Sequence, residues 1–179
     1  FVLPANTAGV SVGSRMDKMA LRTCQMSEVV FDNVMVPSDA VIGRVGSGGT
    51  IFAESMEWER VILVALHVGA MQRILEDSIR YAKTRTASGQ PIGKFQAVSH
   101  RLADMKVRVE AARLLVYRAA GMLGKSREVG EAASIAKLFT SEALLTSATD
   151  AIRTLGGYGV LENGEADCAL RDAVAATIY

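Results

Sequence analysis

The sequence predicts a mainly α fold, an antiparallel four-helix bundle preceded by a short region of strands and turns. Long stretches after residue 50 are rich in alanine, leucine and methionine, which favour helix. Stretches rich in glycine and proline separate them, as expected between helices. With 179 residues, of which 50% are hydrophobic, the chain is long enough to bury a sizeable core.

The N-terminal region is predicted to form strands and turns. Short β-branched runs occur at residues 1–4 (FVLP), 9–13 (GVSVG) and 28–37 (EVVFDNVMVP). In the third run, apolar and polar residues alternate, which suggests one packed face and one solvated face. The stretch GRVGSGGT follows and indicates a hinge-like turn. We therefore expect one domain over residues 1–45 and a helical domain over residues 46–179.

Four helices are expected in the second region. They run from Thr50 to about Thr84, from Phe95 to about Lys125, from Glu128 to about Leu155, and over residues 166–179. The stretch SGQPIG is too rich in glycine and proline to continue the first helix, and GGYGVLENG ends the third. Helices this long normally bury one face against neighbours, which favours an antiparallel bundle.

Composition excludes several functional classes. Lysine plus arginine (20) nearly balances aspartate plus glutamate (19), and no basic run occurs, so no nucleic-acid surface is expected. Two isolated cysteines and two distant histidines predict neither a disulfide framework nor a metal site. No apolar run approaches the roughly 18 residues that a membrane span needs. We expect a protein without membrane, metal or nucleic-acid partners.

Glu59 is the acid that the helical spacing singles out. Residues three and four positions apart are neighbours on a helix. Glu57 has Arg60 at that spacing and is expected to pair with it. The corresponding neighbours of Glu59 are apolar or uncharged: Ser55, Met56, Ile62 and Leu63. An acid on an apolar face either acts as a proton acceptor, with a pKa raised by desolvation, or pairs with an arginine on another helix.

Arg85 and the stretch LGGYG each have two interpretations. Arg85 follows a long helix, where it either stabilises the helix C-terminus or binds a phosphate through its planar guanidinium group. The glycines of LGGYG either stop the third helix or let the backbone approach a planar or phosphorylated ligand. His67 lies within an apolar run and is expected to be a core residue.

The ordered motifs FDNVMVP, ERVILVALHVGAMQ, GQPIGKFQ, LADM, EAARLLVYRAA, LGGYG and LRDA strongly resemble those of the acyl-CoA dehydrogenase family. The branch is the one with isovaleryl-type and carrier-protein acyl dehydrogenases. The resemblance covers essentially the whole chain. It implies the last strands of a β-barrel-like middle domain in residues 1–45 and a C-terminal helical domain, stopping before its final helix, in residues 46–179.

The resemblance implies an FAD-dependent oxidoreductase that desaturates an acyl thioester between its α and β carbons. Glu59 occupies the position of the catalytic base in this branch, and Arg60 that of an arginine beside the substrate. Arg85 and Gln96 match positions that reach the FAD of a neighbouring subunit. Gly156 and Gly157 match the glycine pair near that cofactor, and Arg153, also assigned to cofactor binding, replaces a common glutamine.

Further expectations follow from the same resemblance. The substrate would be an acyl-CoA or an acyl-carrier protein, the assembly a homotetramer built as a dimer of dimers, and the electron acceptor an electron-transfer flavoprotein. Members commonly have an aromatic residue at Ser88, and the usual GGNGY is GGYGV here. In the other main branch a glutamate after the terminal IY supplies the base. The chain by itself is not expected to turn over substrate.

Two other functions stay open at this point: a flavin-dependent hydroxylase of the same superfamily, and a non-catalytic helical scaffold. The hydroxylase would leave the placement of Glu59 without a purpose, because its chemistry needs no α-proton acceptor. We expect a cytoplasmic location, or the mitochondrial matrix in a eukaryote, and a role in fatty acid or secondary metabolism.

Overall fold

The computed structural model describes residues 1–125, 128–162 and 164–179. The chain divides into two compact units, residues 1–55 and residues 56–179. The proposed domain boundary after residue 45 precedes the first helix, whereas the units divide within that helix.

The first unit contains little regular structure. Strand β1 (Val10–Val12) pairs antiparallel with β2 (Val29–Phe31), with Ser11 opposite Val30. The 3-10 helix η1 spans Ser38–Ala40. The run FVLP, predicted as extended, forms no strand. Two of the three predicted β-branched runs therefore supply strands, and each strand is shorter than its run.

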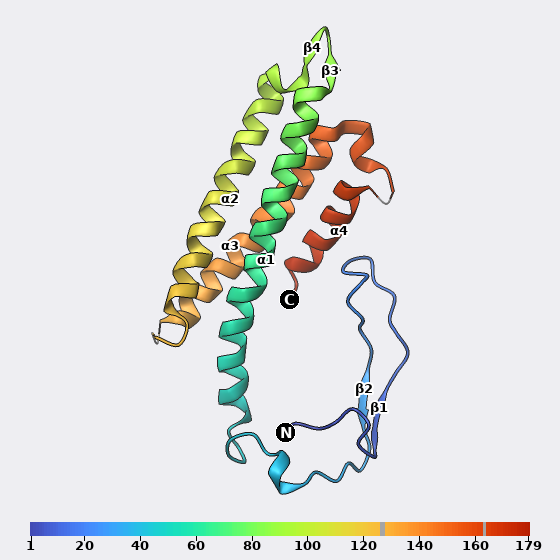
Figure 1. Ribbon diagram of the computed structural model, residues 1–179, viewed down its shortest axis with the longest axis vertical. Coiled ribbons are helices and arrows are strands. Elements are labelled where there is room, and N and C mark those ends of the chain that lie inside the picture. Colours follow the sequence, from blue (N-terminus) through green and yellow to red (C-terminus); the bar gives the residue numbers. More distant parts are fainter. Residues whose placement is uncertain (126–127, 163) are drawn as a thin grey trace. The chain divides into compact units, whose positions relative to one another are not determined.

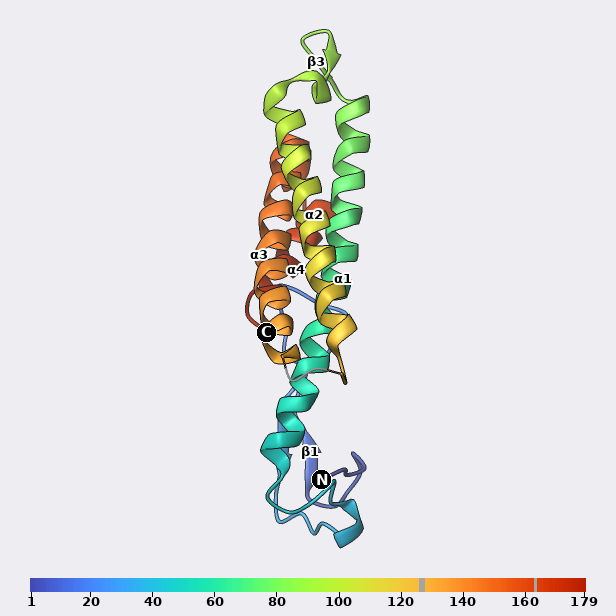
Figure 2. The ribbon, with the colours of Figure 1, turned by 90° about the vertical axis from the view of Figure 1, so that its left-hand side faces the viewer.

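Four helices dominate the chain, as predicted. They are α1 (Gly48–Thr84), α2 (Gln96–Met122), α3 (Val129–Leu155) and α4 (Glu165–Ala176). Within the second unit, consecutive helices alternate in direction and lie alongside one another (Figures 1 and 2). The mainly α prediction is confirmed. No described helix combines the length and apolar character needed to cross a bilayer.

The core of the bundle contains both bulky and small side chains. Met71 and Leu75 of α1 and Met105 of α2 are among the largest fully buried side chains. To the same core, α3 contributes alanines such as Ala133 and Ala136, both with no exposed surface. Alanine lets helix backbones approach closely, and each buried large apolar side chain contributes about 1.5–3 kcal/mol.

A buried carboxylate links α2 to α3. Asp150 is 7% exposed, and its Oδ2 accepts a hydrogen bond from Arg108 Nη1 at 2.8 Å. Arg101 and Arg153 lie at 3.8 and 3.6 Å from Oδ1. Since Arg101 and Arg108 belong to α2 and Asp150 to α3, this cluster ties the two helices together.

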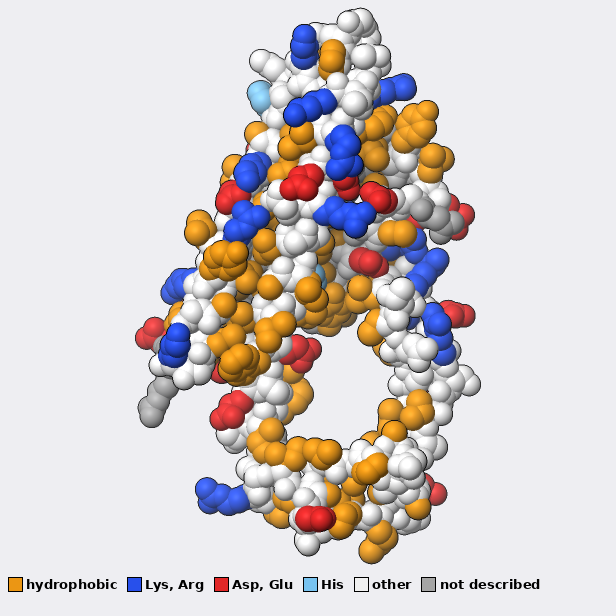
Figure 3. Space-filling view, in the orientation of Figure 1, with side chains coloured by type: hydrophobic (Ala, Val, Ile, Leu, Met, Phe, Trp, Pro, Cys, Tyr) orange, Lys and Arg blue, Asp and Glu red, His pale blue; other side chains and the backbone are white. Residues whose placement is uncertain are grey.

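The connection between α1 and α2 is a small hairpin. Strands β3 (Thr86–Ala87) and β4 (Gln90–Pro91) pair antiparallel, followed by the 3-10 helix η2 (Ile92–Lys94). Ser88 and Gly89 form its two-residue turn with φ of 49° and 79°. Positive φ at both positions is the pattern of a type I′ turn. The glycine and proline of SGQPIG predict the helix break here but not the hairpin. Acidic and basic side chains are interspersed over the half of the bundle that ends at this hairpin (Figure 3).

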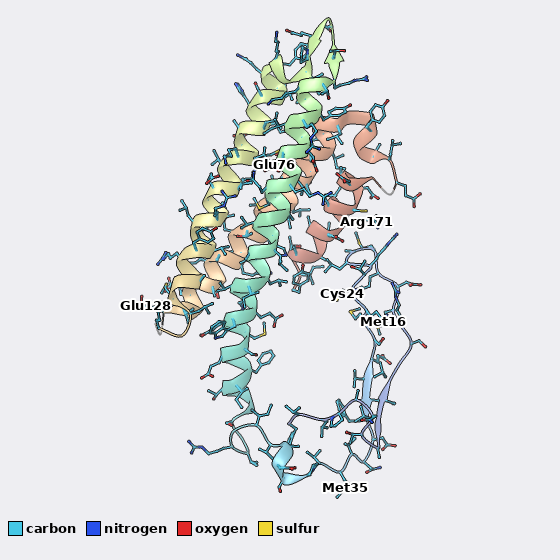
Figure 4. The ribbon with its side chains drawn as sticks, in the orientation of Figure 1. Met16, Cys24, Met35, Glu76, Glu128 and Arg171 are labelled. Atoms are coloured by element: carbon cyan, nitrogen blue, oxygen red, sulfur yellow. The ribbon has the colours of Figure 1, made fainter. Side chains whose placement is uncertain are left out.

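Glycines shape the end of α3. Gly156 ends the helix at φ 61°, a conformation that favours glycine, and the 3-10 helix η3 (Gly156–Val160) follows. A Cβ atom on Gly159 would lie 2.5 Å from the carbonyl oxygen of Ile152, so only glycine fits this position. Arg171 of α4 (Figure 4), in the motif LRDA, donates hydrogen bonds of 3.0 and 2.9 Å to Asp167, one turn earlier on the helix.

Candidate active site

A cavity of about 330 Å³ lies beside Glu59, between α1, α3 and the segment after α4. We call it the Glu59 cavity. Its lining residues are Met56, Glu59, Arg60, Leu63, Ser134, Lys137 and Tyr179. The four residues from α1 are spaced by three and four positions, so the periodicity of the helix brings them to one face. The cavity therefore combines one acid, two cations, two hydroxyl groups and two apolar side chains.

Glu59 does not lie in the desolvated environment that the sequence predicted. Met56 and Leu63 flank it as expected, but its side chain is exposed, and Arg60 and Lys137 line the same cavity. Among the described residues, neither Glu59 nor Lys137 forms an ion pair. The helical spacing identified neighbours on α1 only, so it could not reveal a lysine on α3. No arginine in residues 1–125, 128–162 and 164–179 pairs with Glu59, so the alternative interpretation finds no support in this part of the chain.

Glu57, two residues earlier, is oriented differently. The expected ion pair with Arg60 is absent from the described part of the chain. Glu57 Oε1 instead approaches the first turn of α3, where it would lie 3.2 Å from a Cβ atom on Gly130. Acidic groups are favoured at helix N-termini. The dipole of α3 therefore stabilises the Glu57 carboxylate at this position, away from the Glu59 cavity.

His67 borders the Glu59 cavity through Tyr179. His67 is 7% exposed, and its Nε2 lies 3.3 Å from the Tyr179 hydroxyl oxygen. The two ring centroids are 6.1 Å apart, with the rings tilted by 51°. Burial, and then the charge of Lys137, lower the pKa of His67 from its usual 6.5. The prediction of a core histidine agrees with this burial, but its Nδ1 is also buried and has no hydrogen-bond partner in the described structure.

A second pocket, of about 440 Å³, lies at the far end of α1. Its lining residues are Tyr81, Arg85, Ile92, Thr154, Leu155, Gly156, Gly157, Tyr158 and Leu161, and we call it the Arg85 pocket. The guanidinium carbon of Arg85 stands 5.9 Å from the centroid of the Tyr158 ring. Tyr81 packs edge-on against Tyr158 at 6.4 Å and donates a hydrogen bond of 3.4 Å to the Leu155 carbonyl. The altered tyrosine of GGYGV therefore orients Arg85.

The predicted cofactor residues fall into two groups. Arg85, Gly156 and Gly157 meet in the Arg85 pocket. Gln96 and Arg153 do not line it: Gln96 is the exposed first residue of α2, and Arg153 is exposed and turned to Asp150. Arg153 lies three residues before Gly156 in the sequence, but its side chain turns back along α3 toward Asp150.

Several residues of these sites were missed by the sequence analysis. They are Ser134, Lys137 and Tyr179 in the Glu59 cavity and Tyr158 in the Arg85 pocket. Ser134 and Lys137 are three residues apart and so share a face of α3, which was an available signal. Their proximity to Glu59, however, depends on how α3 packs against α1.

The two sites lie far apart on one helix. Glu59 and Thr84, the last residue of α1, are separated by 25 residues of helix, or about 38 Å at a rise of 1.5 Å per residue. A single dinucleotide bound at the Arg85 pocket of a chain cannot also reach Glu59 of that chain. Each site therefore needs a contribution from elsewhere if both serve one reaction.

Known proteins share this architecture. The family model for the acyl-CoA dehydrogenase C-terminal domain matches residues 46–179. An L-prolyl-[peptidyl-carrier protein] dehydrogenase of Pseudomonas fluorescens is 42% identical over all 179 residues, which correspond to 47% of that protein. An acyl-CoA dehydrogenase of Bacillus subtilis is 37% identical over the same 179 residues, which again correspond to 47% of that protein.

Solved structures agree with this relationship. A crystal structure of an FAD-dependent dehydrogenase matches the whole chain with a TM-score of 0.97 and 44% identity, and 48% of that protein is covered. The prolyl acyl carrier protein oxidase AnaB matches 99% of the chain with a TM-score of 0.95 and 40% identity, over 47% of its own length. The chain thus spans about half the length of these relatives. With a family match over residues 46–179, the chain belongs to the acyl-CoA dehydrogenase family.

Proposed function

We propose that the protein containing this chain catalyses the FAD-dependent α,β-dehydrogenation of an acyl thioester, with Glu59 as the base. The observation that carries this proposal is an acid without an ion-pair partner, in the described structure, at a cavity of about 330 Å³. Membership of the family supports the reaction type. The names of the relatives include both acyl-CoA and carrier-protein dehydrogenases, so both kinds of thioester are candidate substrates.

Glu59 would remove the proton from the carbon next to the thioester carbonyl. Since no side chain in the described ranges competes for its carboxylate, Glu59 is available to accept that proton. Negative charge then grows on the thioester oxygen, and donors placed around such an oxygen stabilise it. Lys137 and Tyr179 carry the donors that the Glu59 cavity offers for this purpose.

The residues of the Arg85 pocket fit the diphosphate of FAD. Arg85 has no acidic partner within the described residues, and a planar guanidinium suits a phosphate. A Cβ atom on Gly156 or Gly157 would meet nothing within 4 Å, so a ligand can approach this backbone closely. When bound, FAD supplies a flavin that accepts the β hydrogen as hydride.

The separation of the two sites favours an assembly of several copies. The two sites of one chain are about 38 Å apart. An FAD whose diphosphate binds in the Arg85 pocket of one chain would therefore reach Glu59 of another chain with its flavin. This supports the expected homotetramer, a dimer of dimers. We further propose that Gln96 and Arg153 contact the FAD of a neighbouring subunit and that an electron-transfer flavoprotein reoxidises the flavin.

The base is tested by comparing Glu59→Gln with Glu57→Gln in the full-length protein. Glutamine cannot accept the α proton, so Glu59→Gln should bind FAD normally but lose at least about a thousandfold in desaturation, the upper part of the range for a proton acceptor. Glu57 faces α3 instead of the cavity, so its variant should remain within about threefold of the wild type. Near-normal turnover by Glu59→Gln would assign the base elsewhere.

The cofactor site is tested by comparing Arg85→Gln with Arg80→Gln. Arg80 lies in the last turns of α1, just before Arg85, but it pairs with Asp77 at 2.9 Å and does not line the Arg85 pocket. Arg85→Gln should weaken FAD binding by about tenfold or more, as loss of a charge-assisted contact implies. Equal FAD affinity in both variants would contradict the assignment. NAD(P)H-dependent oxygen uptake without desaturation would instead identify a hydroxylase.

A further inference from the structure

The contact between His67 and Tyr179 leaves one nitrogen of the imidazole without a partner. Nε2 is 3.3 Å from the Tyr179 hydroxyl, while Nδ1 is buried and makes no hydrogen bond to any described residue. The burial of His67, reinforced by the nearby charge of Lys137, lowers its pKa, so the ring is neutral near neutral pH. A neutral imidazole carries its proton on only one of these nitrogens.

The environment decides between the two tautomers. A proton on Nδ1 would create a buried N–H donor with no acceptor, which is rare and costly in proteins. A proton on Nε2 leaves Nδ1 as a bare acceptor, a less costly state, and gives Nε2–H an acceptor in Tyr179. The hydrogen bond therefore runs from His67 Nε2–H to the Tyr179 oxygen.

This direction determines what Tyr179 can do. A hydroxyl group has one proton to donate, and here its oxygen already accepts from His67. Its own proton is then free to point elsewhere, and Tyr179 lines the Glu59 cavity. With the opposite tautomer, the hydroxyl would donate to Nε2 and would offer the cavity only an acceptor.

We propose that His67 is a positioning residue that makes the Tyr179 hydroxyl a hydrogen-bond donor to an oxygen of the substrate bound in the Glu59 cavity. This inference rests on the proposed function, because it assumes that the thioester occupies this cavity. His67 is buried and does not line the cavity. Its effect on the reaction therefore passes through Tyr179.

The tautomer is tested directly by 15N solid-state NMR of the full-length protein labelled at histidine. The His67 signals are assigned by their loss in His67→Gln, with His100→Gln, an exposed histidine on α2, as the matched control. We expect the chemical shift of a protonated Nε2 and a bare Nδ1. A protonated Nδ1, or a doubly protonated ring at neutral pH, would overturn the inference whatever the activity.

A set of variants tests the functional consequence. Tyr179→Phe removes the donor and should lower kcat/KM by about tenfold, the effect of one neutral hydrogen bond. His67→Leu should produce a similar loss, and His67→Gln, whose amide nitrogen can replace Nε2 as donor, should restore most of the activity. Because His67 acts through Tyr179, the double variant His67→Leu/Tyr179→Phe should be no worse than Tyr179→Phe. Additive losses would refute this coupling.

The two proposals fail in different ways. Turnover that survives Glu59→Gln refutes the proposed base but leaves the tautomer measurement untouched. A Glu59→Gln variant without activity, together with a fully active Tyr179→Phe variant, refutes only the role of Tyr179. If His67→Leu does not fold, the tautomer of the wild type and the Tyr179→Phe rate still decide the question.

Discussion

Substitution of Asp150 by asparagine should show how much the link between α2 and α3 contributes to stability. Asparagine has nearly the same shape as aspartate but carries no charge. It would leave the guanidinium groups of Arg101 and Arg108, whose side chains are only 26% and 22% exposed, without a carboxylate partner.

The geometry of the contacts around Asp150 determines the expected loss in the free energy of unfolding. The hydrogen bond of 2.8 Å from Arg108 is charge-assisted, and such bonds contribute about 1.5–3 kcal/mol. Breaking a fully buried ion pair costs about 3–5 kcal/mol, but the arginines here retain some contact with water. The more distant Arg101 and Arg153 add little. We expect Asp150→Asn to lower the free energy of unfolding by about 2–3 kcal/mol.

Asp77→Asn is the matched control. Asp77 also contacts two arginines, Arg73 at 3.7 Å and Arg80 at 2.9 Å, but their side chains are 70% and 73% exposed. Exposed ion pairs contribute about 0–1 kcal/mol. Urea unfolding followed by far-UV circular dichroism should give a shift of about 1 M or more for Asp150→Asn and little for Asp77→Asn. Equal shifts would refute the argument that burial determines the difference.

Three other changes test the core, the end of α3 and the buried histidine. Met71→Ala should cost about 2–5 kcal/mol, measured by urea unfolding, because Met71 has no exposed surface and the variant leaves a cavity. Gly159→Ala should lower the melting temperature clearly, since its Cβ would lie 2.5 Å from the Ile152 carbonyl oxygen, whereas Gly157→Ala, with open space around it, should not. Burial lowers the pKa of His67 below 6.5, so the unfolded chain binds a proton more readily than the folded one. The free energy of unfolding should therefore have its full value above about pH 6.5 and should fall as the pH drops through the folded pKa of His67. In the same urea assay, His67→Gln should lose less of this free energy than the wild type between about pH 7 and pH 5. An equal loss in both proteins would contradict the assignment to His67.

The amino-acid sequence by itself determined the helices and the places where they end. Helix formation depends on local chemistry: alanine-rich runs favour α3, while the glycine after Leu155 accepts the positive φ that stops it. The same local reasoning placed Glu59 beside Met56 and Leu63 on one face of α1. The hairpin at Ser88 was missed because its strands are two residues long, too short for an alternating pattern.

Only the tertiary structure decided what surrounds those residues. Lys137 and Tyr179 lie 78 and 120 positions after Glu59 in the sequence, and nothing in the spacing of α1 indicates that they share its cavity. The spacing within α1 predicts an apolar setting for Glu59, whereas the charge of Lys137 comes from α3. Likewise, the pairing of Arg108 with Asp150 and the placement of Arg85 over the Tyr158 ring depend on how separate elements pack. Periodicity within a helix determines which residues share its face, but the packing of helices determines what that face meets.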